Sequence, residues 1–400
     1  MSGDKVSKQY PDSLLKRGVA EVIIEEELKE LLQSGTILRL KQGFDPSRPD
    51  IHLGHVVGLR KLRQFQELGH KVVLIIGDWT AQIGDPSGVS ITRPMLSADE
   101  VQRNAQTYLE QFFNVVDEKK TEVRWQSEWF KKWSLSDIFR ISSKFTLAQF
   151  MAREDFNNRY STGRPIALTE LLYPMLQAYD SVAIQSNVEF GGIDQKFNCL
   201  VGRDLQMSMG QKPQQVFLVP LLVGIDGTHK MSKSLNNYIG ITDKPEEMYG
   251  KVMSIPDKII MNYFELVTNI SDEELDELSH QMETQSVNLM LLKQRLARDI
   301  VGQFHGEEQA LLAEDQFTRV FQKKEVPEVI LEYKLPDSTP NIIDILHSSG
   351  MIKSRSEARR LLEQGAIDID DVKLQGDDIN FSPHSGNIIK VGKRRFLRLL

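Results

Sequence analysis

The sequence predicts an α/β protein built on a parallel sheet, and three consecutive segments near its start predict it. Residues 36–46, "TILRLKQGFDP", have the pattern of a strand that enters a turn. Residues 71–78, "KVVLIIGD", form the continuous apolar run of a buried parallel strand. Between them, apolar residues recur at every third position over 56–65, and Gly69 can end that helix. This strand–helix–strand unit predicts a Rossmann-like sheet with right-handed crossovers.

The other elements of the first 240 residues extend this sheet and add helices. Residues 12–34 predict a helix with a leucine face among acidic residues. Residues 216–224, "VFLVPLLVG", predict another buried strand. Residues 97–160 are rich in aromatic side chains and predict a helical insertion between the two halves of the sheet. We therefore expect residues 1–240 to form one Rossmann-like domain.

The C-terminal part of the chain predicts two smaller domains. Residues 241–326 return to helical periodicity and predict a helical domain. Residues 327–340 contain three prolines and predict a linker. Residues 341–400 predict a small α+β domain, in which "SRSE" (354–357) fits a helix-capping box and Gly365 can end the helix.

The composition predicts a soluble protein of the reducing cytoplasm without membrane contact. Cys199 is the single cysteine, so no disulfide can form within the chain. The N-terminal residues lack the apolar stretch of a signal peptide, and the longest apolar run, 72–76, is too short to cross a bilayer. The net charge of −7 argues weakly against a nucleic-acid partner. Basic clusters at 353–360 and 390–398 are either solvated faces or local RNA-binding patches.

Two histidines flank a glycine where the first long helix is expected to begin, within "DPSRPDIHLGHVVGL". His52 and His55 could bind zinc, but no third ligand is evident nearby and no glutamate follows His52 as in helical zinc proteases. A helix N-terminus offers free N–H groups and a positive dipole end, which suit phosphate. Gly54 permits close approach of a ligand to the backbone. We therefore expect an anion site here and no metal held by protein ligands.

A second polar stretch, "GTHKMSKSLNN" (227–237), follows the strand expected to end near residue 224. Lys230 and Lys233 bracket a serine, and Ser234 follows, so two ammonium groups and hydroxyls are available to a leaving pyrophosphate. A polar surface loop is the alternative for such a stretch alone. Together with "HLGH", however, "KMSKS" resembles the two signatures of class I aminoacyl-tRNA synthetases. That resemblance implies that both motifs hold ATP, accompanied by Mg²⁺, while an amino acid is activated.

Further stretches narrow the resemblance to one family. "GFDPSRPDIHLGH", "IGDPSG", "YPMLQAYD" and "FGGIDQ" together resemble tyrosyl-tRNA synthetases, and the tail from residue 341 is similar to an S4-type RNA-binding domain. The resemblance implies that L-tyrosine and ATP form tyrosyl-adenylate and that tyrosine passes to the 3′ end of tRNA(Tyr). It also implies a homodimer and makes residues 241–326 an anticodon-arm-binding domain. Tryptophanyl-tRNA synthetase and a non-catalytic RNA-binding relative are the alternatives.

The residues themselves favour a tyrosine pocket. Tyr173, Gln177 and Asp180 share one face of a helix whose other residues are largely apolar. A solvated polar face is the alternative, but a buried carboxylate needs a partner, and a substrate phenol would be one. The resemblance implies that Asp180 accepts the phenol proton and that Tyr173, Gln177 and Asp85 surround the α-ammonium group.

The resemblance also assigns the remaining site positions by function. The phosphate-facing catalytic residues are Ser47, His52, His55, Lys230, Lys233 and Ser234. The other ATP-binding positions are Gly43, Asp45, Gly54, Gly192 and Asp194. Tyrosine is also met by Thr80 and Gln195, and tRNA by Arg355, Arg359 and Arg360.

Two positions depart from the family pattern. Lys41 stands where many members have a tyrosine that also contacts the phenol hydroxyl, so Asp180 is expected to carry more of that recognition. Val89 stands where many have a lysine that helps to hold pyrophosphate, although Arg93 keeps the later basic position. Pyrophosphate contacts are therefore expected to depend more on Lys230 and Lys233.

Overall fold

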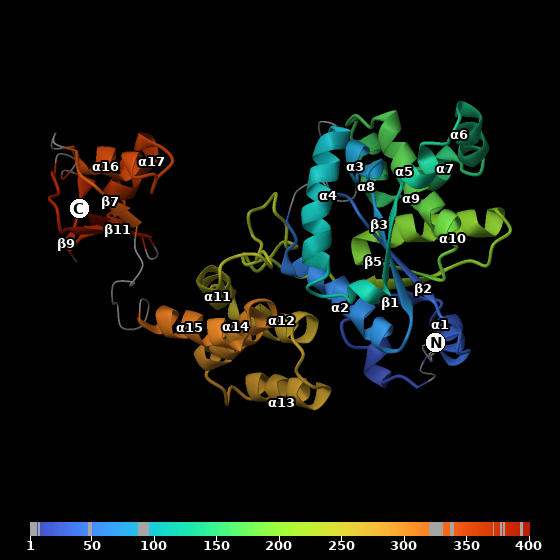
Figure 1. Cartoon of the computed structure of the whole chain (residues 1–400), viewed down its shortest axis with the longest axis horizontal. Coiled ribbons are helices and arrows are strands. Elements are labelled where there is room, and N and C mark those ends of the chain that lie inside the picture. The colour runs from blue at the N-terminus through green and yellow to red at the C-terminus, as the bar shows by residue number, and fades with distance from the viewer. Residues whose placement is uncertain are drawn as a thin grey trace. The chain divides into compact units, whose positions relative to one another are not determined.

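The computed structural model describes residues 6, 9–46, 50–86, 96–319, 331–336, 340–370, 372–376, 378, 381–392 and 395–400. The chain falls into two compact units, Met1–Ala310 and Leu311–Leu400 (Figure 1). The first unit contains a six-stranded sheet and the second a five-stranded sheet.

The six-stranded sheet confirms the predicted α/β class. Its order is β1-β6-β5-β2-β3-β4, and all neighbours are parallel except β1 and β6. The strand order reverses at β2, which pairs with β3 on one side and with β5 on the other; α/β proteins bind ligands at such a switch point, outside the carboxyl ends of the strands. The strands are β1 (Glu21–Ile23), β2 (Arg39–Phe44), β3 (Lys71–Ile76), β4 (Thr121–Trp125), β5 (Val188–Gly192) and β6 (Gln215–Val219).

Helices surround this sheet (Figure 1). Helix α2 forms where its apolar stripe predicts it, with Val56, Leu59, Leu62 and Phe65 buried. It ends at Glu67, two residues before a glycine with φ of 98°. The helices of this region are α1 (Glu25–Gln33), α2 (Leu53–Glu67), α3 (Thr80–Ile83), α4 (Ala98–Phe112), α5 (Ser127–Phe130), α6 (Leu135–Ser142), α7 (Leu147–Met151), α8 (Glu154–Ser161), α9 (Leu168–Ile184) and α10 (Lys196–Ser208).

The prediction of one helix over 12–34 is wrong. Residues 12–15 form a 3₁₀ turn, β1 follows, and α1 begins only at Glu25. The run Glu21-Val-Ile-Ile contains three successive β-branched residues, and it adds to the edge of the sheet beside β6.

The predicted insertion over 97–160 is helical only in part, because β4 lies inside it. This strand is the outer neighbour of β3, and its burial is intermediate at every position. Its charged side chains are paired: Glu122 accepts from Arg39 at 3.0 Å and from Arg124 at 3.1 Å. Charged residues are common on edge strands, where they conceal the alternation that predicts a strand.

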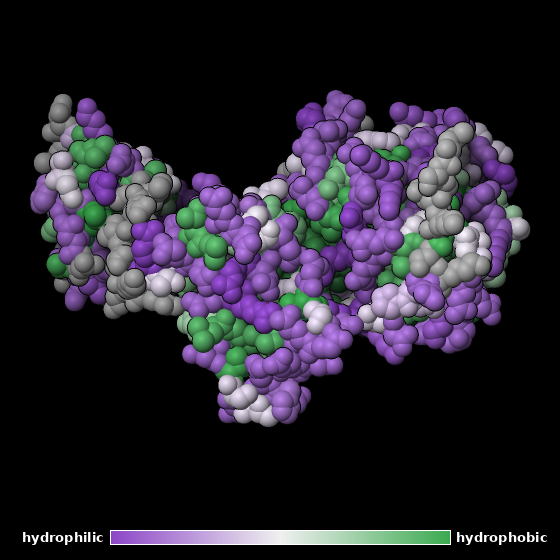
Figure 2. Space-filling model, turned by 60° about the horizontal axis from the view of Figure 1, so that its bottom comes forward, coloured by the Kyte–Doolittle hydropathy of each residue, from purple (hydrophilic) through white to green (hydrophobic). Residues whose placement is uncertain are grey.

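Helices continue after β6, as the sequence predicts. They are α11 (Pro245–Met253), α12 (Ile260–Val267), α13 (Asp272–Glu283), α14 (Leu289–His305) and α15 (Glu307–Phe317). Within the described residues, no helix is long and apolar enough to cross a membrane. The face of the surface in Figure 2 is mostly hydrophilic, with separate hydrophobic patches.

The second unit has the predicted α+β composition. Its sheet has the order β7-β11-β10-β8-β9, and an apolar core that includes Ile342, Leu346 and Leu397 joins it to two helices. Its elements are β7 (Leu331–Tyr333), α16 (Ile342–Ser348), α17 (Arg355–Glu363), β8 (Ile367–Ile369), β9 (Val372–Lys373), β10 (Ile388–Val391) and β11 (Arg395–Leu399).

Two details of this unit differ from the prediction. Residues 331–333, expected in a linker, form β7 and pair in parallel with β11. Only one of the two hydrogen bonds of the predicted capping box is present: Ser354 Oγ accepts from the Glu357 N–H at 3.2 Å. The Glu357 carboxylate accepts from the N–H of Lys353 instead of that of Ser354.

Candidate active site

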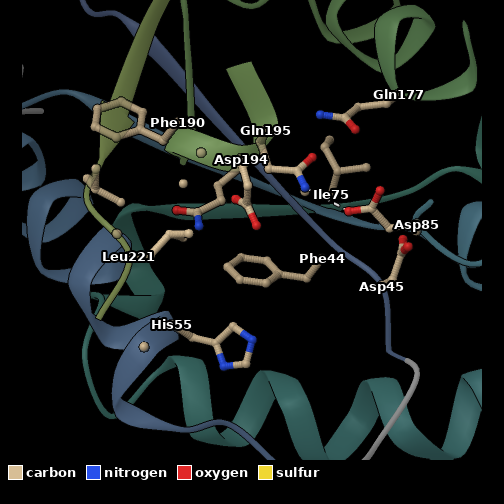
Figure 3. A pocket seen from close by; sticks show the side chains of 18 of the residues that line it. Phe44, Asp45, His55, Ile75, Asp85, Gln177, Phe190, Asp194, Gln195 and Leu221 are labelled. Atoms are coloured by element: carbon tan, nitrogen blue, oxygen red, sulfur yellow. Dashed lines mark hydrogen bonds between the residues drawn. The ribbon is translucent and has the colours of Figure 1, made fainter. Parts of the chain in front are cut away.

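A cavity of about 370 Å³ opens at the carboxyl ends of β2, β3, β5 and β6. The first turn of α2 and the middle of α9 complete its walls. In Figure 3, Phe44 lies near the centre of the view, with His55 below it and Gln177, Asp85 and Asp45 on one side. Fourteen of the predicted site residues line this cavity: Gly43, Asp45, His52, Gly54, His55, Thr80, Asp85, Tyr173, Gln177, Asp180, Gly192, Asp194, Gln195 and Lys230.

Three predicted phosphate-facing residues are not among those that line the cavity. Lys233 and Ser234 lie on the adjoining loop. Ser47 falls outside the described residues, as do the family-variant Val89 and the nearby Arg93.

The Asp180 carboxylate forms one end of the cavity and is only 2% exposed. Gln126 Nε2 donates to its Oδ2 at 2.8 Å, and Trp129 Nε1 donates to its Oδ1 at 3.2 Å. Burial raises the pKa of Asp180 to about 7, against the opposing effects of Lys41 and these donors. Because a carboxylate offers about four lone-pair sites, it retains capacity for another donor.

Gln126 and Trp129 were missed by sequence reasoning. Gln126 is the residue directly after β4, so recognising that strand would have placed it at the carboxyl edge of the sheet, beside the site. Gln126 Oε1 also accepts from the backbone N–H of Thr80 at 3.0 Å, so one side chain joins Asp180 to the start of α3.

A hydrogen-bonded group of three side chains lies beside Asp180. Tyr173 donates its hydroxyl proton to Asp45 Oδ2 at 2.8 Å, and Thr80 Oγ1 donates to Asp45 Oδ1 at 2.6 Å. Burial, together with the charges of Asp45 and Asp85, holds the pKa of Tyr173 well above its usual value, so the phenol stays a donor. Gly77 makes room for this group, because a Cβ there would lie 2.3 Å from Asp45 Oδ1 and from Thr80 Oγ1.

The third part of the cavity follows β5. Gln195 Nε2 donates to Asp85 Oδ2 at 2.7 Å, and Asn198 holds Gln195 through a bond of 3.0 Å. Next to them, Asp194 pairs with Lys230 at 2.7 Å. A carboxylate, a carboxamide and an ammonium group thus stand side by side at the carboxyl end of β5.

The two histidines form the opposite end of the cavity. His52 precedes the first residue of α2, and its N–H donates to His55 Nδ1 at 3.3 Å. Burial, assisted by the charge of Lys233, lowers the pKa of His55 to about 4, so its ring is neutral at pH 7. Because Nδ1 accepts, the proton of this neutral ring is on Nε2, and His55 is a donor at that atom. Burial also lowers the pKa of His52 well below its usual value.

The structure brings the loop of residues 225–240 against the start of α2. Lys233 Nζ donates to the carbonyl oxygen of Asp50 and lies 3.5 Å from its carboxylate. The backbone N–H of Leu53 donates to Ile239 at 3.0 Å. The histidine motif and the lysine motif, distant in sequence, are therefore neighbours, as their predicted cooperation requires.

The described residues contain no group of three or more His, Cys, Asp or Glu side chains that could hold a metal ion. Buried donors, a positive loop and a helix N-terminus instead form a site suited to an anionic substrate. The opposite end, with Asp180 and Tyr173, is suited to a small molecule that carries a hydroxyl and an ammonium group.

Two family models match the chain. The model of class I tRNA synthetases (W and Y) matches residues 33–322. The model of the tyrosine–tRNA ligase SYY-like C-terminal domain matches residues 316–398.

Individual relatives match along nearly the whole chain. The sequence is 60% identical to a tyrosine–tRNA ligase of Dehalococcoides mccartyi over 98% of this chain and 99% of that protein. It is 49% identical to a tyrosine–tRNA ligase of Thermotoga maritima over 96% of each. The crystal structure of the Archaeoglobus fulgidus tyrosyl-tRNA synthetase complexed with L-tyrosine has the same fold, with a TM-score of 0.62 and 23% identity over 76% of this chain and 98% of that one. The chain therefore belongs to the tyrosine–tRNA ligase family of class I aminoacyl-tRNA synthetases.

Proposed function

We propose that the cavity joins L-tyrosine to ATP, forming tyrosyl-adenylate and pyrophosphate, and that the enzyme then transfers tyrosine to the 3′ end of tRNA(Tyr). One observation carries this proposal: the neutral histidine pair and the lysine loop meet at one end of a cavity whose other end holds the buried Asp180. Phosphate groups fit the first end, and the side chain of tyrosine fits the second.

Asp180 accepts the phenol proton of the substrate in this proposal. Tyr173, Gln177 and Asp85 surround its ammonium group, while Thr80 and Gln195 support them through the bonds described above. An amino acid without the hydroxyl leaves the buried carboxylate without its partner, so phenylalanine is rejected; the handling of phenylalanine by this enzyme family is itself a standard illustration of that principle.

The ATP end works by position and charge. The tyrosine carboxylate, ionised at neutral pH, attacks the α-phosphorus in line, and pyrophosphate leaves. His55 Nε2 donates to the phosphates, and Lys230 and Lys233 balance the charge that develops on pyrophosphate. His52, Ser47 and Ser234 add donors, Mg²⁺ enters with the ATP phosphates as part of the substrate, and the nucleotide is held at Gly43, Asp45, Gly54, Gly192 and Asp194.

Lys230 has a partner that the substrate must displace. Its ammonium group is paired with Asp194, and we propose that Asp194 holds the ribose hydroxyls of ATP. Binding of ATP therefore exchanges this ion pair for two separate contacts, ribose on Asp194 and phosphate on Lys230.

Pyrophosphate exchange measured with each of the twenty amino acids tests the activation step. Tyrosine alone should support rapid exchange of labelled pyrophosphate into ATP. Exchange that depends on tryptophan would overturn the tyrosine assignment. Absence of exchange together with retained RNA binding would favour the non-catalytic relative.

Transfer RNA is proposed to bind the second unit and the helices of 241–326. Arg359 and Arg360 are exposed on α17, and Arg355 at its start is exposed although it pairs with Asp344 at 2.9 Å. Contacts of this kind with phosphates make tRNA affinity fall steeply with salt. Replacing all three arginines with glutamine should weaken tRNA charging and leave pyrophosphate exchange unchanged.

A homodimer in the cytoplasm is the proposed state of the enzyme. Leu135 and Phe139 on α6 are 64% and 63% exposed, next to an apolar cavity of about 310 Å³ lined by Trp133 and Ile138. Such a surface supports burial against a second copy. Light scattering should give the mass of two chains, and Phe139→Asp should give the mass of one.

A further inference from the structure

Lys41 lies beneath the cavity and does not line it. It stands in the central strand β2, directly across the ladder from Glu189 of β5, and its side chain is fully buried. All three ammonium protons have acceptors: Glu189 Oε1 at 2.9 Å, Ser181 Oγ at 2.7 Å and the carbonyl oxygen of Gln177 at 2.8 Å. The ammonium group therefore joins two strands of the sheet to one turn of α9.

The Glu189 carboxylate extends the same connection. Its Oε1 accepts from Gln177 Nε2 at 3.1 Å, and its Oε2 accepts from Ser181 Oγ at 3.2 Å and from Gln214 Nε2. Gln177 is thus held twice, by its carbonyl oxygen on Lys41 and by its side chain on Glu189. Lys41 and Glu189 therefore fix the turn of α9 that carries Gln177 and Asp180 into the cavity.

We propose that Lys41 and Glu189 are positioning residues for tyrosine, which hold Gln177 and Asp180 in their binding geometry from beneath the pocket without contacting the substrate. This inference rests on the proposed role of Gln177 and Asp180 in binding tyrosine. In this role Lys41 does not contact the phenol hydroxyl of the substrate, unlike the tyrosine that many family members have at this position.

The two positioning residues also act on Asp180 in opposite directions. The charge of Lys41 lowers the pKa of Asp180, and the charge of Glu189 raises it. Removing Lys41 should therefore raise the pKa of Asp180, and removing Glu189 should lower it. Among the described residues, the titratable groups that face Asp180 or share its end of the cavity are Lys41 of β2, Asp45 directly after β2, Glu189 of β5, Tyr173 of α9 and Asp85.

The test measures tyrosine-dependent pyrophosphate exchange as a function of pH. Lys41→Met should move the acid limb of kcat/KM for tyrosine to higher pH, and Glu189→Gln should move it to lower pH. The double variant Lys41→Met/Glu189→Gln leaves no lone buried charge, so it should fold even if Lys41→Met does not. It should raise KM for tyrosine by about 10- to 100-fold, because Gln177 loses the ammonium donor to its carbonyl oxygen and the charged acceptor of its side chain, and leave KM for ATP within about twofold.

A matched control is another buried ion pair on the same helix. Glu170 of α9 accepts from Arg159 at 2.9 Å, away from the cavity. Arg159→Met/Glu170→Gln should change thermal stability without changing the acid limb. Unchanged KM for tyrosine in the folded Lys41/Glu189 double variant, or acid limbs that move together in the single variants, would overturn the inference. Wild-type enzyme without tyrosine-dependent exchange would instead overturn the proposed function.

Discussion

At the scale of single residues, the tyrosine end depends on a carboxylate whose protonation changes near neutral pH. Asp180 has a pKa of about 7 because it is buried, although Gln126 and Trp129 both donate to it. An ionised carboxylate accepts a phenol proton more strongly than a protonated carboxyl group does. The group proposed to accept the phenol proton of the substrate therefore becomes a weaker acceptor as the pH falls through 7.

The first prediction concerns this titration. Below pH 7 a growing fraction of Asp180 is protonated, so kcat/KM for tyrosine should fall about tenfold per pH unit. Asp180→Asn should remove this limb and lower kcat/KM at neutral pH by about 10- to 100-fold, the effect of losing one hydrogen bond to a charged group. Exchange rates at subsaturating tyrosine measure both effects. A profile that stays flat through the acid range in the wild type would contradict the assignment.

The second prediction concerns the absence of a side chain at Gly77. In Gly77→Ala the new methyl group would meet Asp45 Oδ1 and Thr80 Oγ1 at 2.3 Å. The hydrogen-bonded side chains of Asp45, Thr80 and Tyr173 must then move apart. KM for tyrosine should rise by about 10- to 100-fold. Gly302→Ala in α14 is the control, because a Cβ there meets nothing within 4 Å. Equal tyrosine KM in the two variants would show that this packing has no role in binding.

At the scale of elements, the start of α2 and the loop of residues 225–240 act as one unit. A backbone bond joins Leu53 to Ile239, and Lys233 adds a side-chain bond to Asp50. The positive charge of Lys233 also contributes to the low pKa of His55. The loop thus adds to the effect of burial, which is the main reason that both histidines are neutral at pH 7.

The third prediction follows from that arrangement. Lys233→Ala should slow formation of the adenylate by about 100- to 1,000-fold, or about 3–4 kcal/mol of barrier, because a charge that balances pyrophosphate is lost. Tyrosine binding should stay the same, since Lys233 lies at the other end of the site. Single-turnover kinetics separates the two quantities, with Lys212→Ala, an exposed lysine, as control. A weaker tyrosine complex with an intact chemical step would contradict the loop assignment.

The elements also show which features sequence patterns can predict. Strands β3 and β6 and the apolar face of helix α2 are buried, so their apolar patterns stand out and were predicted. Strand β2 is of mixed burial and was predicted from the turn that follows it, whereas the buried β5, a short run that ends in two glycines, was not predicted. Strands β1 and β4 lie at the two edges of the sheet, where burial is intermediate, and both were missed. Their assignment depends on partners far away in sequence rather than on their own periodicity.

The same reason explains which residues of the site could be predicted from the sequence. Motifs with a chemical pattern, such as "HLGH" and "KMSKS", and the family resemblance that they support identified fourteen of the residues that line the cavity. Gln126, Trp129 and Glu189 carry no pattern of their own. They matter only because the fold brings them to Asp180 and Gln177.

At the scale of the whole molecule, activation is assigned to the first unit, and part of the proposed tRNA recognition is assigned to the second. The cavity is built entirely from residues 42–232, within the first unit. The exposed arginines of α17 belong to the second unit, which has a separate apolar core.

The fourth prediction tests this division. A chain that ends after residue 310 should keep pyrophosphate exchange within about twofold and lose most tRNA charging, which would fall with the lost phosphate contacts. Ending the chain at 336 instead would leave β7 without its partner β11, so that variant should aggregate more readily. Exchange and aminoacylation assays on the same preparations measure both. Full charging by the shorter chain would refute the assignment of the second unit.

Strand β1 has a consequence for synthesis on the ribosome. Its neighbour Ile24 donates to the side chain of Gln215, which lies 191 residues further along the chain. At about 5–20 residues per second, this segment waits roughly 10–40 s before its partner strand is translated. During that time the nascent N-terminus carries an unpaired β-branched run, to which a chaperone or a nascent chain on a neighbouring ribosome can bind.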